Sequence, residues 1–354
     1  DYAHLRGVRV YVTLNTAILP SEVDRALECA RQAYRAGADA FIVQDVGVAA
    51  ELARSLPQAR LHISTQMNTH NAAGIEAAAK LGARRVTLAR ELSLAEVEHL
   101  AGIASDLGLE VEAFAHGALC VCYSGQCFMS SMIGGRSANR GLCAQACRLP
   151  YELRNRAQRK ELPSPGEHLL SPQDLCVIDL MPELVAAGAA SLKIEGRNKK
   201  GFYVATAVHA YRSVLDGADV SEAAAELGAI SHRPYSTGFY YGRAEQSPER
   251  DGYVRECVHA ATVERAGARV VVVCHNRFRE GDELEVLSPR RPVARVRVRN
   301  LAWLPAPAPD DPSDAAPVPV AVANRSAERY SFEVHAALAP GDYLRARVGG
   351  RAFS

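Results

Sequence analysis

The sequence predicts an α/β protein: a parallel (β/α) barrel lacking its first two strands, followed by a small antiparallel β-barrel domain. Three observations carry this prediction. Short apolar runs alternate with Ala-rich amphipathic segments over the first two-thirds of the chain, which is typical of a parallel sheet. Only six such runs occur, whereas a closed barrel of this type needs about eight. From Tyr253 onward the period changes to strict alternation of apolar and polar residues, which indicates antiparallel strands.

The six predicted strands are short, rich in β-branched residues and bounded by turn residues, as expected for strands buried on both faces. They are Val8–Leu14, Ala40–Val43, Leu61–Ser64, Arg85–Leu88, Leu109–Phe114 and Ser191–Ile194. The amphipathic segments between them predict helices at Ser21–Ala36, Asn71–Leu81 and Leu94–Leu107. Ser21 and Ser93 stand where helix N-caps are expected.

Six strands leave two alternatives, an open sheet or a barrel whose first two β-α units are absent. The chain starts at Asp1 and runs almost directly into a strand. The second alternative is therefore the preferred interpretation.

Beyond the sixth strand the sequence predicts a helix at Tyr203–Leu215 and then the antiparallel domain. The polar, basic stretch at Leu153–Gly166 indicates an insertion before the last parallel strand. The Pro-rich segment Leu304–Pro319 predicts a loop. The predicted organisation is a catalytic domain at 1–230, a linker at 231–252 and a β-domain at 253–354.

Composition excludes several classes of protein. The chain has 354 residues, 48% of them hydrophobic, and a formal net charge of +1, so binding of nucleic acid through bulk charge is not expected. No apolar run is long enough to span a membrane and no secretory signal is visible. Five of the nine cysteines lie between Cys120 and Cys147, which favours a cytoplasmic protein with a metal site over a disulfide framework.

Four cysteines form the candidate metal site. Cys120, Cys127, Cys143 and Cys147 are separated by six, fifteen and three residues. Four thiolates suit zinc or an iron–sulfur cluster; the lack of paired Cys-x-x-Cys knuckles favours the cluster, and unconnected buried cysteines are the structural alternative. Cys122 is too close to Cys120 to be a good ligand, and Cys176 is a reserve ligand. The remaining cysteines, Cys29, Cys257 and Cys274, are expected to be packing residues.

Polar residues gather where the predicted strands end, and the carboxyl ends of parallel strands form the active edge of such folds. These residues are Asn15, Gln44, Gln66, Arg90, Glu112, His116, Lys193 and Glu195. Asn15, Gln44, Gln66 and Arg90 are expected to line one pocket, and His116 is a further site candidate. His62, inside a strand, is expected to be a core residue. Arg197, Lys199 and Lys200 form a basic patch that reads as a solvated surface or as a phosphate contact.

The segment "EAFAHGALCVCYSGQCFMSS" contains Glu112-x-Phe114-x-x-Gly117-x-x-Cys120 followed by Gly125-x-Cys127 and Ser130. This pattern resembles the collagenase-like peptidase family, and the resemblance continues through "NRGLCAQACRLPYEL", "LLSPQDLC" and "LKIEGR". The later "SHRPYSTGFYYG" resembles the branch that carries a C-terminal β-barrel and includes prephenate-dependent tRNA uridine hydroxylases.

The resemblance implies a TIM-like barrel and a [4Fe–4S] cluster on Cys120, Cys127, Cys143 and Cys147. It further implies hydroxylation of carbon 5 of the wobble uridine in the tRNA anticodon loop, with prephenate as co-substrate. Arg90 and Lys193 would then bind carboxylates, with Asn15, Gln44, Gln66 and Arg197 as further substrate contacts. Glu112, His116 and Glu195 would be acid/base candidates, and RNA would contact the β-domain and the basic stretch Arg148–Lys160. A peptidase and a zinc-stabilised RNA-binding module are the alternative functions.

Overall fold

The computed structural model describes residues 1–249, 253–289, 291–305 and 316–348. The chain divides into two compact units. Unit 1 consists of Asp1–Glu195 together with residues 233–249, and unit 2 of residues 196–232 and the described residues from 253 onward. The sequence-based division differs, because it kept residues 196–230 with the first domain and treated 231–252 as a linker.

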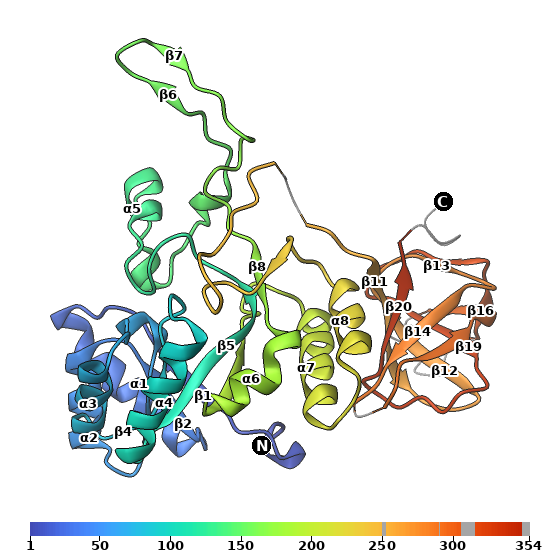
Figure 1. Ribbon diagram of the computed structural model, residues 1–354. Helices are drawn as coiled ribbons and strands as arrows, with labels where there is room; N and C mark the ends of the chain where they lie inside the picture. The colour runs from blue at the N-terminus through green and yellow to red at the C-terminus, as the bar shows by residue number, and fades with distance from the viewer. Residues whose placement is uncertain (250–252, 290, 306–315, 349–354) are drawn as a thin grey trace. The chain divides into compact units, whose positions relative to one another are not determined.

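Unit 1 is built on one sheet (Figure 1). Its strands are β1 (Tyr11–Leu14), β2 (Ala40–Val43), β3 (Arg60–Ile63), β4 (Ala83–Thr87), β5 (Glu110–Ala118), β8 (Asp174–Cys176), β9 (Ala189–Ile194) and β10 (Tyr235–Ser236). Strands β1 to β5 pair in parallel in chain order, and β9 adds to β5 in parallel. These are the six predicted strands, in the predicted parallel arrangement.

Two short strands were not predicted. Beyond the last residue of β4, strand β8 pairs antiparallel with the end of β5, and β10 pairs in parallel with β8. Strand β5 therefore runs to Ala118, four residues past its predicted end. Among the described residues β1 pairs only with β2, so the parallel strands form an open sheet.

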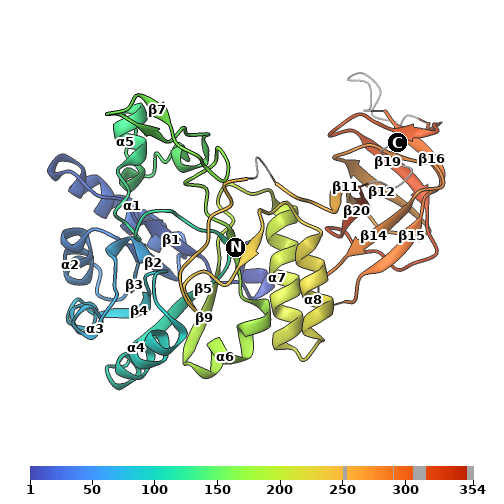
Figure 2. The ribbon, with the colours of Figure 1, turned by 45° about the horizontal axis from the view of Figure 1, so that its top comes forward.

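Helices cover one side of this sheet (Figure 2). They are α1 (Val23–Arg35), α2 (Val46–Ser55), α3 (Ala72–Lys80), α4 (Leu94–Asp106) and α6 (Met181–Ala186). Ser93 caps α4 in a capping box with Glu96, as predicted. Ser21 is not an N-cap; it lies inside a short 3₁₀ helix, and α1 begins after it.

The segment after β5 carries the cysteines and an arm. Helix α5 (Met129–Gly134) lies between Cys127 and Cys143. A hairpin of β6 (Arg154–Asn155) and β7 (Lys160–Glu161) then projects from the rest of unit 1 (Figure 1). The predicted basic insertion is this hairpin.

Unit 2 joins a helix pair to an antiparallel sheet. The helices are α7 (Gly201–Leu215) and α8 (Val220–Gly228), and the short strands β13 (Phe278–Arg279) and β18 (Val322–Ala323) pair separately. The main sheet contains β11 (Cys257–Arg265), β12 (Arg269–Cys274), β14 (Glu283–Leu287), β15 (Ala294–Arg297), β16 (Arg299–Leu304), β17 (Val318–Pro319), β19 (Arg329–Glu333) and β20 (Tyr343–Arg347).

The order in the main sheet is β15-β14-β20-β11-β12-β19-β16-β17, so the antiparallel domain is confirmed. The described pairings give an open, curled sheet with β15 and β17 at its edges, not a closed barrel. Its apolar core includes Val272, Phe278 and Phe332, all fully buried. Most of the loop predicted at Leu304–Pro319 lies outside the described residues.

Candidate functional site

A charged cluster lies on one face of the unit 1 sheet, on the neighbouring strands β4, β5 and β9. Glu112, near the start of β5, is buried and accepts hydrogen bonds from Thr87 Oγ1 at 2.9 Å, Ser191 Oγ at 2.8 Å and Lys193 Nζ at 2.7 Å. Arg85 Nη1 lies 3.6 Å from the same carboxylate. Burial alone would raise the pKa of Glu112, but Lys193 and the hydroxyl donors hold it below its ordinary value. We call these five residues the Glu112 cluster; it places Lys193 on this face by an ion pair.

Two cations flank one aromatic ring beside this cluster. Arg90 Cζ lies 5.2 Å from the centroid of the Phe114 ring, and Lys193 Nζ lies 5.7 Å from it. Both distances are within cation–π range. Lys193 keeps 25% of its side chain exposed although it is paired with Glu112. The arrangement presents two positive charges on one surface, which suits an anion with more than one carboxylate.

The backbones of His116 and Glu195 contact each other near the carboxyl end of β5. The His116 ring is buried, 5.3 Å from the Tyr235 ring, and its backbone carbonyl accepts a hydrogen bond from the Glu195 N–H at 2.8 Å. Gly117 has φ +112°, and a Cβ there would lie 2.4 Å from the Glu195 carbonyl oxygen. The close approach of these two chain segments therefore requires glycine.

We call the segment from Cys120 to Cys147 the cysteine loop. Hydrogen bonds and close packing hold it against the carboxyl ends of β3 and β4. Glu91 Oε1 accepts hydrogen bonds from the Ser124 N–H at 2.9 Å and its hydroxyl at 3.2 Å, and Glu91 Oε2 lies 3.4 Å from His70 Nε2. Gly125 has φ +73° and packs so closely that a Cβ would lie 2.1 Å from the Gln66 carbonyl oxygen. The loop between Cys122 and Cys127 is thus held against the active edge of the sheet.

The same contacts bear on peptidase chemistry. In a serine protease the histidine lies between the serine and the carboxylate, so that it can take the serine proton. Here the Glu91 carboxylate lies between Ser124 and His70. This group therefore has the order of an anchoring network rather than that of a nucleophile with its base.

Five cysteine thiols gather on this loop. Burial, the neighbouring Cys127 thiol and the charges of Cys120 and Cys147 raise the pKa of Cys122 to about 12. Burial also raises the pKa of Cys147, with Cys120, Cys143 and Cys127 contributing. Sulfur donors in one region are the donor chemistry that zinc or an iron–sulfur cluster takes. In the part of the chain that the structure describes, no three such side chains form a preassembled metal-binding set.

The sulfur donors therefore suit zinc or an iron–sulfur cluster. The structure places Cys122 near the four predicted ligands, so position alone does not exclude Cys122 as a ligand. Cys176, the reserve ligand, lies on β8 opposite His116 in the strand register. Cys257 and Cys274 are buried, as expected for packing residues, whereas Cys29 is exposed and that prediction for it is wrong.

The other predicted site residues divide between the units. Asn15 and Gln44 directly follow β1 and β2, and Gln66 lies in a 3₁₀ turn after β3. His62 is a buried core residue, as predicted, and burial beside Arg85 lowers its pKa to about 4. Arg197 belongs to unit 2, apart from the unit that carries the Glu112 cluster.

Sequence reasoning missed several partners, among them Arg85, Thr87, Ser191 and Ser124. A signal was present in the alternation of polar residues along two strands: Arg85 and Thr87 on β4, Ser191 and Lys193 on β9. Residues two apart on a strand share a face, so this pattern marks a polar face that the assumption of strands buried on both sides concealed.

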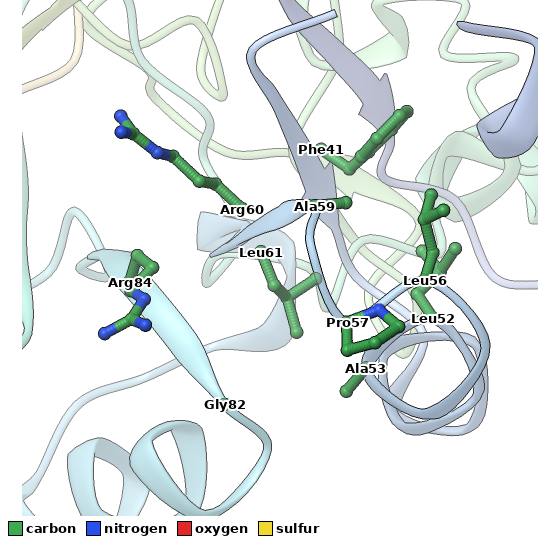
Figure 3. Close-up of a pocket in the computed structure, with 10 residues that line it drawn as sticks. All are labelled: Phe41, Leu52, Ala53, Leu56, Pro57, Ala59, Arg60, Leu61, Gly82 and Arg84. Atoms are coloured by element: carbon green, nitrogen blue, oxygen red, sulfur yellow. The ribbon is translucent and has the colours of Figure 1, made fainter. Parts of the chain in front are cut away.

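A shallow cavity of about 220 Å³ opens at the other end of the strands (Figure 3). It is lined by Phe41 of β2, by Leu52 of α2 and Leu56 just after that helix, and by Arg60 and Arg84 near the amino ends of β3 and β4. Active sites of parallel α/β folds lie at the carboxyl ends of the strands. This cavity is therefore separate from the candidate site.

The fold and the site together define an α/β protein with a polar sheet face and a thiol-rich loop at its active edge. Residues 1–250 match the family model described as peptidase family U32, and the chain belongs to that family. None of the described helices has both the length and the apolar character needed to cross a membrane.

Three relatives show how the chain compares with curated proteins. It is 40% identical over 215 residues to a 23S rRNA 5-hydroxycytidine synthase of Escherichia coli (strain K12), covering 61% of this chain and 32% of that protein. It is 31% identical to tRNA hydroxylation protein P1 of Bacillus subtilis (strain 168), covering 82% of this chain and 72% of the relative. It is 29% identical to a collagenase of Porphyromonas gingivalis (strain ATCC BAA-308 / W83), covering 84% and 77%. The chain thus spans about a third of the length of the E. coli synthase.

Proposed function

We propose that this chain hydroxylates carbon 5 of a pyrimidine in RNA, with the wobble uridine of tRNA as its target. The observation that carries the proposal is the similarity to tRNA hydroxylation protein P1, which extends over 310 residues and 82% of the chain. The 23S rRNA 5-hydroxycytidine synthase supports the same class of reaction on RNA.

The cysteine loop would hold a [4Fe–4S] cluster through Cys120, Cys127, Cys143 and Cys147. Thiolate donors, their gathering in one loop and the fastening of that loop by Glu91 and Gly125 support this assignment. When bound, such a cluster would supply one-electron chemistry at the edge of the sheet. The chain's own contribution is to hold the loop at the end of β4, beside Arg90.

The paired cations would bind prephenate, a cyclic dicarboxylate. Arg90 offers a planar fork that can bind one carboxylate with two hydrogen bonds, while Lys193 offers a point charge for the other. The Phe114 ring, which lies within cation–π distance of both, is buried beside them. In this proposal Glu112 is a positioning residue that fixes Lys193, and His116 and Glu195 are the remaining candidates for proton transfer.

Unit 1 would contact RNA through the β6–β7 arm. Arg154, Arg156, Arg159 and Lys160 are all exposed on it and can meet phosphates of a single-stranded loop. Arg148, at the start of the predicted basic stretch, has another role. Its guanidinium donates hydrogen bonds to the backbone carbonyls of Pro172 at 3.0 Å and Leu119 at 2.8 Å, so it fastens the chain locally.

We also propose that the six parallel strands form part of the wall of a TIM-like barrel. Two observations support this view. The six strands lie in the sheet in chain order, with β9 next to β5, and polar residues stand at their carboxyl ends.

Mass spectrometry of nucleosides tests the proposed function. A strain that lacks the gene for this chain is complemented with the gene, and its tRNA is digested and measured for 5-hydroxyuridine. The proposal expects 5-hydroxyuridine only in the complemented strain, and a Cys127→Ala variant to leave it absent. Cleavage of gelatin by metal-free protein, with no hydroxylated pyrimidine in tRNA or rRNA, would instead support the peptidase function named for the P. gingivalis relative.

A further inference from the structure

Three aromatic rings of unit 2 form a stacked column. Phe202 on α7 stacks on His259 of β11, with ring centroids 5.3 Å apart and an interplanar angle of 14°. His259 stacks in turn on His275, which follows β12, at 4.2 Å and 29°. Phe202 is buried, His259 is half-buried and His275 is exposed, so the column runs from the core to the surface. Its last ring belongs to the exposed residue His275 and stacks on His259.

The column is fixed by hydrogen bonds rather than by packing alone. The Thr262 hydroxyl lies 3.0 Å from His259 Nε2 and 3.1 Å from His275 Nε2, so one hydroxyl bridges both imidazoles. The backbone N–H of His275 donates to the Ala260 carbonyl at 2.8 Å, and Asn276 Nδ2 donates to the backbone carbonyl of His259 at 2.8 Å, so the chain that carries both rings is also held. The His275 ring itself is held by the Thr262 hydroxyl and by stacking on His259, and such pre-organisation lowers the entropy lost when a ligand stacks on it.

The rings are neutral near pH 7 and a positive charge lies close to them. Burial lowers the pKa of His259 to about 4, with His275 and Lys200 adding to the effect. Burial and Lys200 also lower the pKa of His275. Lys200 is exposed just before α7 begins, so the surface combines an uncharged aromatic face with a nearby ammonium group.

We propose that the His275 end of the column is a stacking platform for one unpaired base of single-stranded RNA, with Lys200 contacting an adjacent phosphate. Every base has a π-face and every nucleotide an anionic phosphate, and histidine and other aromatic rings serve as stacking partners in RNA-binding proteins. This inference rests on the proposed function, in that RNA is taken as the substrate. It adds a binding site in unit 2, outside the cysteine loop and the Glu112 cluster.

The test uses the full chain and two fluorescent probes, a short oligouridylate and the same ribose-phosphate chain without bases. His275→Ala should weaken binding of the oligouridylate by at least about fivefold, the low end of the loss for one stacked base. His275→Tyr, which keeps a ring, should bind within about twofold of wild type, and the matched control His335→Ala, at another exposed histidine of unit 2, should not change binding. Binding of the probe without bases should be the same in all four proteins.

The outcomes separate this inference from the proposed function. Unchanged oligouridylate binding by His275→Ala refutes the platform, even if wild-type protein hydroxylates RNA. Equal weakening by His275→Tyr and His275→Ala also refutes it, because the imidazole nitrogen, as a hydrogen-bonding group or metal ligand, would then be what matters. If the wild type hydroxylates no RNA but His275→Ala still loses only base-dependent binding, the proposed function fails and the platform stands. Unchanged thermal unfolding of His275→Ala confirms that the loss is not one of folding.

Discussion

Each unit contains a buried network of ions, and the two networks differ in what they leave accessible. In unit 2 the Arg345 side chain is 1% exposed and donates to Glu226 on α8 at 2.7 and 2.8 Å and to Glu285 on β14 at 2.8 Å. Arg347 binds the other oxygen of Glu285 at 2.9 Å. In unit 1 the Glu112 carboxylate is buried in the same way, but its partner Lys193 is 25% exposed and lies over the Phe114 ring.

This difference distinguishes a structural network from one that can bind a ligand. The Arg345 guanidinium is enclosed, so its contacts can only join α8 to the sheet. The Lys193 ammonium is anchored by a buried carboxylate and still reaches solvent next to Arg90. A buried charge pair by itself is weak support for either role, and accessibility of the cation decides between them.

Removing Arg345 should give the largest loss of stability. Arg345→Met takes from Glu226 the arginine that binds both its oxygens and leaves Glu285 paired with Arg347, and breaking a buried ion pair in this way costs about 3–5 kcal/mol. Denaturant unfolding of the full chain measures this loss, and the far more exposed Arg347 provides the control, since Arg347→Met should cost about 1 kcal/mol or less. Equal unfolding midpoints for Arg345→Met and wild type would show that this network does not hold α8 on the sheet.

Acid should destabilise both units, because each contains a histidine whose pKa is lowered by burial. Of the two, His62 in unit 1 gives the clearer test. Its pKa is about 4 in the folded chain against an ordinary value of 6.5, so between these values the unfolded chain binds a proton that the folded chain does not. Stability should therefore fall as pH decreases from 6.5 to 4, by up to about 3 kcal/mol from this residue. His62→Phe should flatten the dependence of unfolding free energy on pH in this window, leaving the part due to His259. An unchanged pH dependence would contradict the burial of His62 as its cause.

Loss of Arg90 should weaken the carboxylate site without unfolding unit 1. Arg90→Ala should reduce prephenate affinity by about 1.5–3 kcal/mol, the usual loss for a charge-assisted hydrogen bond, and Arg90→Lys should restore only part of it. The measurement is 5-hydroxyuridine formed in tRNA as prephenate concentration is varied. Arg84→Ala, at an exposed arginine of β4, the strand that precedes Arg90, is the control. Wild-type response to prephenate in Arg90→Ala would remove this residue from the site.

A comparison of alanine variants at Gly125 and Gly135 distinguishes the effect of backbone strain from the effect of displacing the cysteine loop. Both have positive φ, +73° and +65°, so alanine strains the backbone by about 1 kcal/mol at either position. Only at Gly125 does a Cβ meet another backbone atom, the Gln66 carbonyl oxygen, while nothing lies within 4 Å at Gly135. Gly125→Ala should therefore abolish iron binding and Gly135→Ala should retain it; iron content of the purified proteins decides. Equal iron in both would mean that this close approach does not position the loop.

Much of the fold was predictable because strand and helix periods are local properties of the sequence. All six parallel strands, helix α4 with its Ser93 cap and the antiparallel domain follow from such patterns. Strand β8 has three residues and β10 two, and they form only because β5 extends past its neighbour β4, which is a tertiary effect. The grouping of α7 and α8 with unit 2 depends on long-range contacts such as Arg345–Glu226.

The candidate site was predictable in its residue types more than in its geometry. Cysteine spacing indicated one thiol-rich region, and the structure gathers those thiols. Glu112 was expected at the end of a strand but lies near the start of β5, paired with Lys193 from β9. That pairing joins residues 81 positions apart in the chain, so no local pattern indicates it.

The metal content of the anaerobically reconstituted chain tests the central claim, that the cysteine loop of unit 1 is a cluster site, most directly. We predict about four irons and four sulfides per chain, the composition of a cubane cluster. Cys120→Ala, Cys127→Ala, Cys143→Ala and Cys147→Ala should each lose the cluster, and Cys122→Ala should keep it. Colourless protein with zinc and no sulfide would contradict the claim and favour the zinc-stabilised RNA-binding module. Loss of the cluster in Cys176→Ala with retention in Cys147→Ala would contradict the ligand assignment.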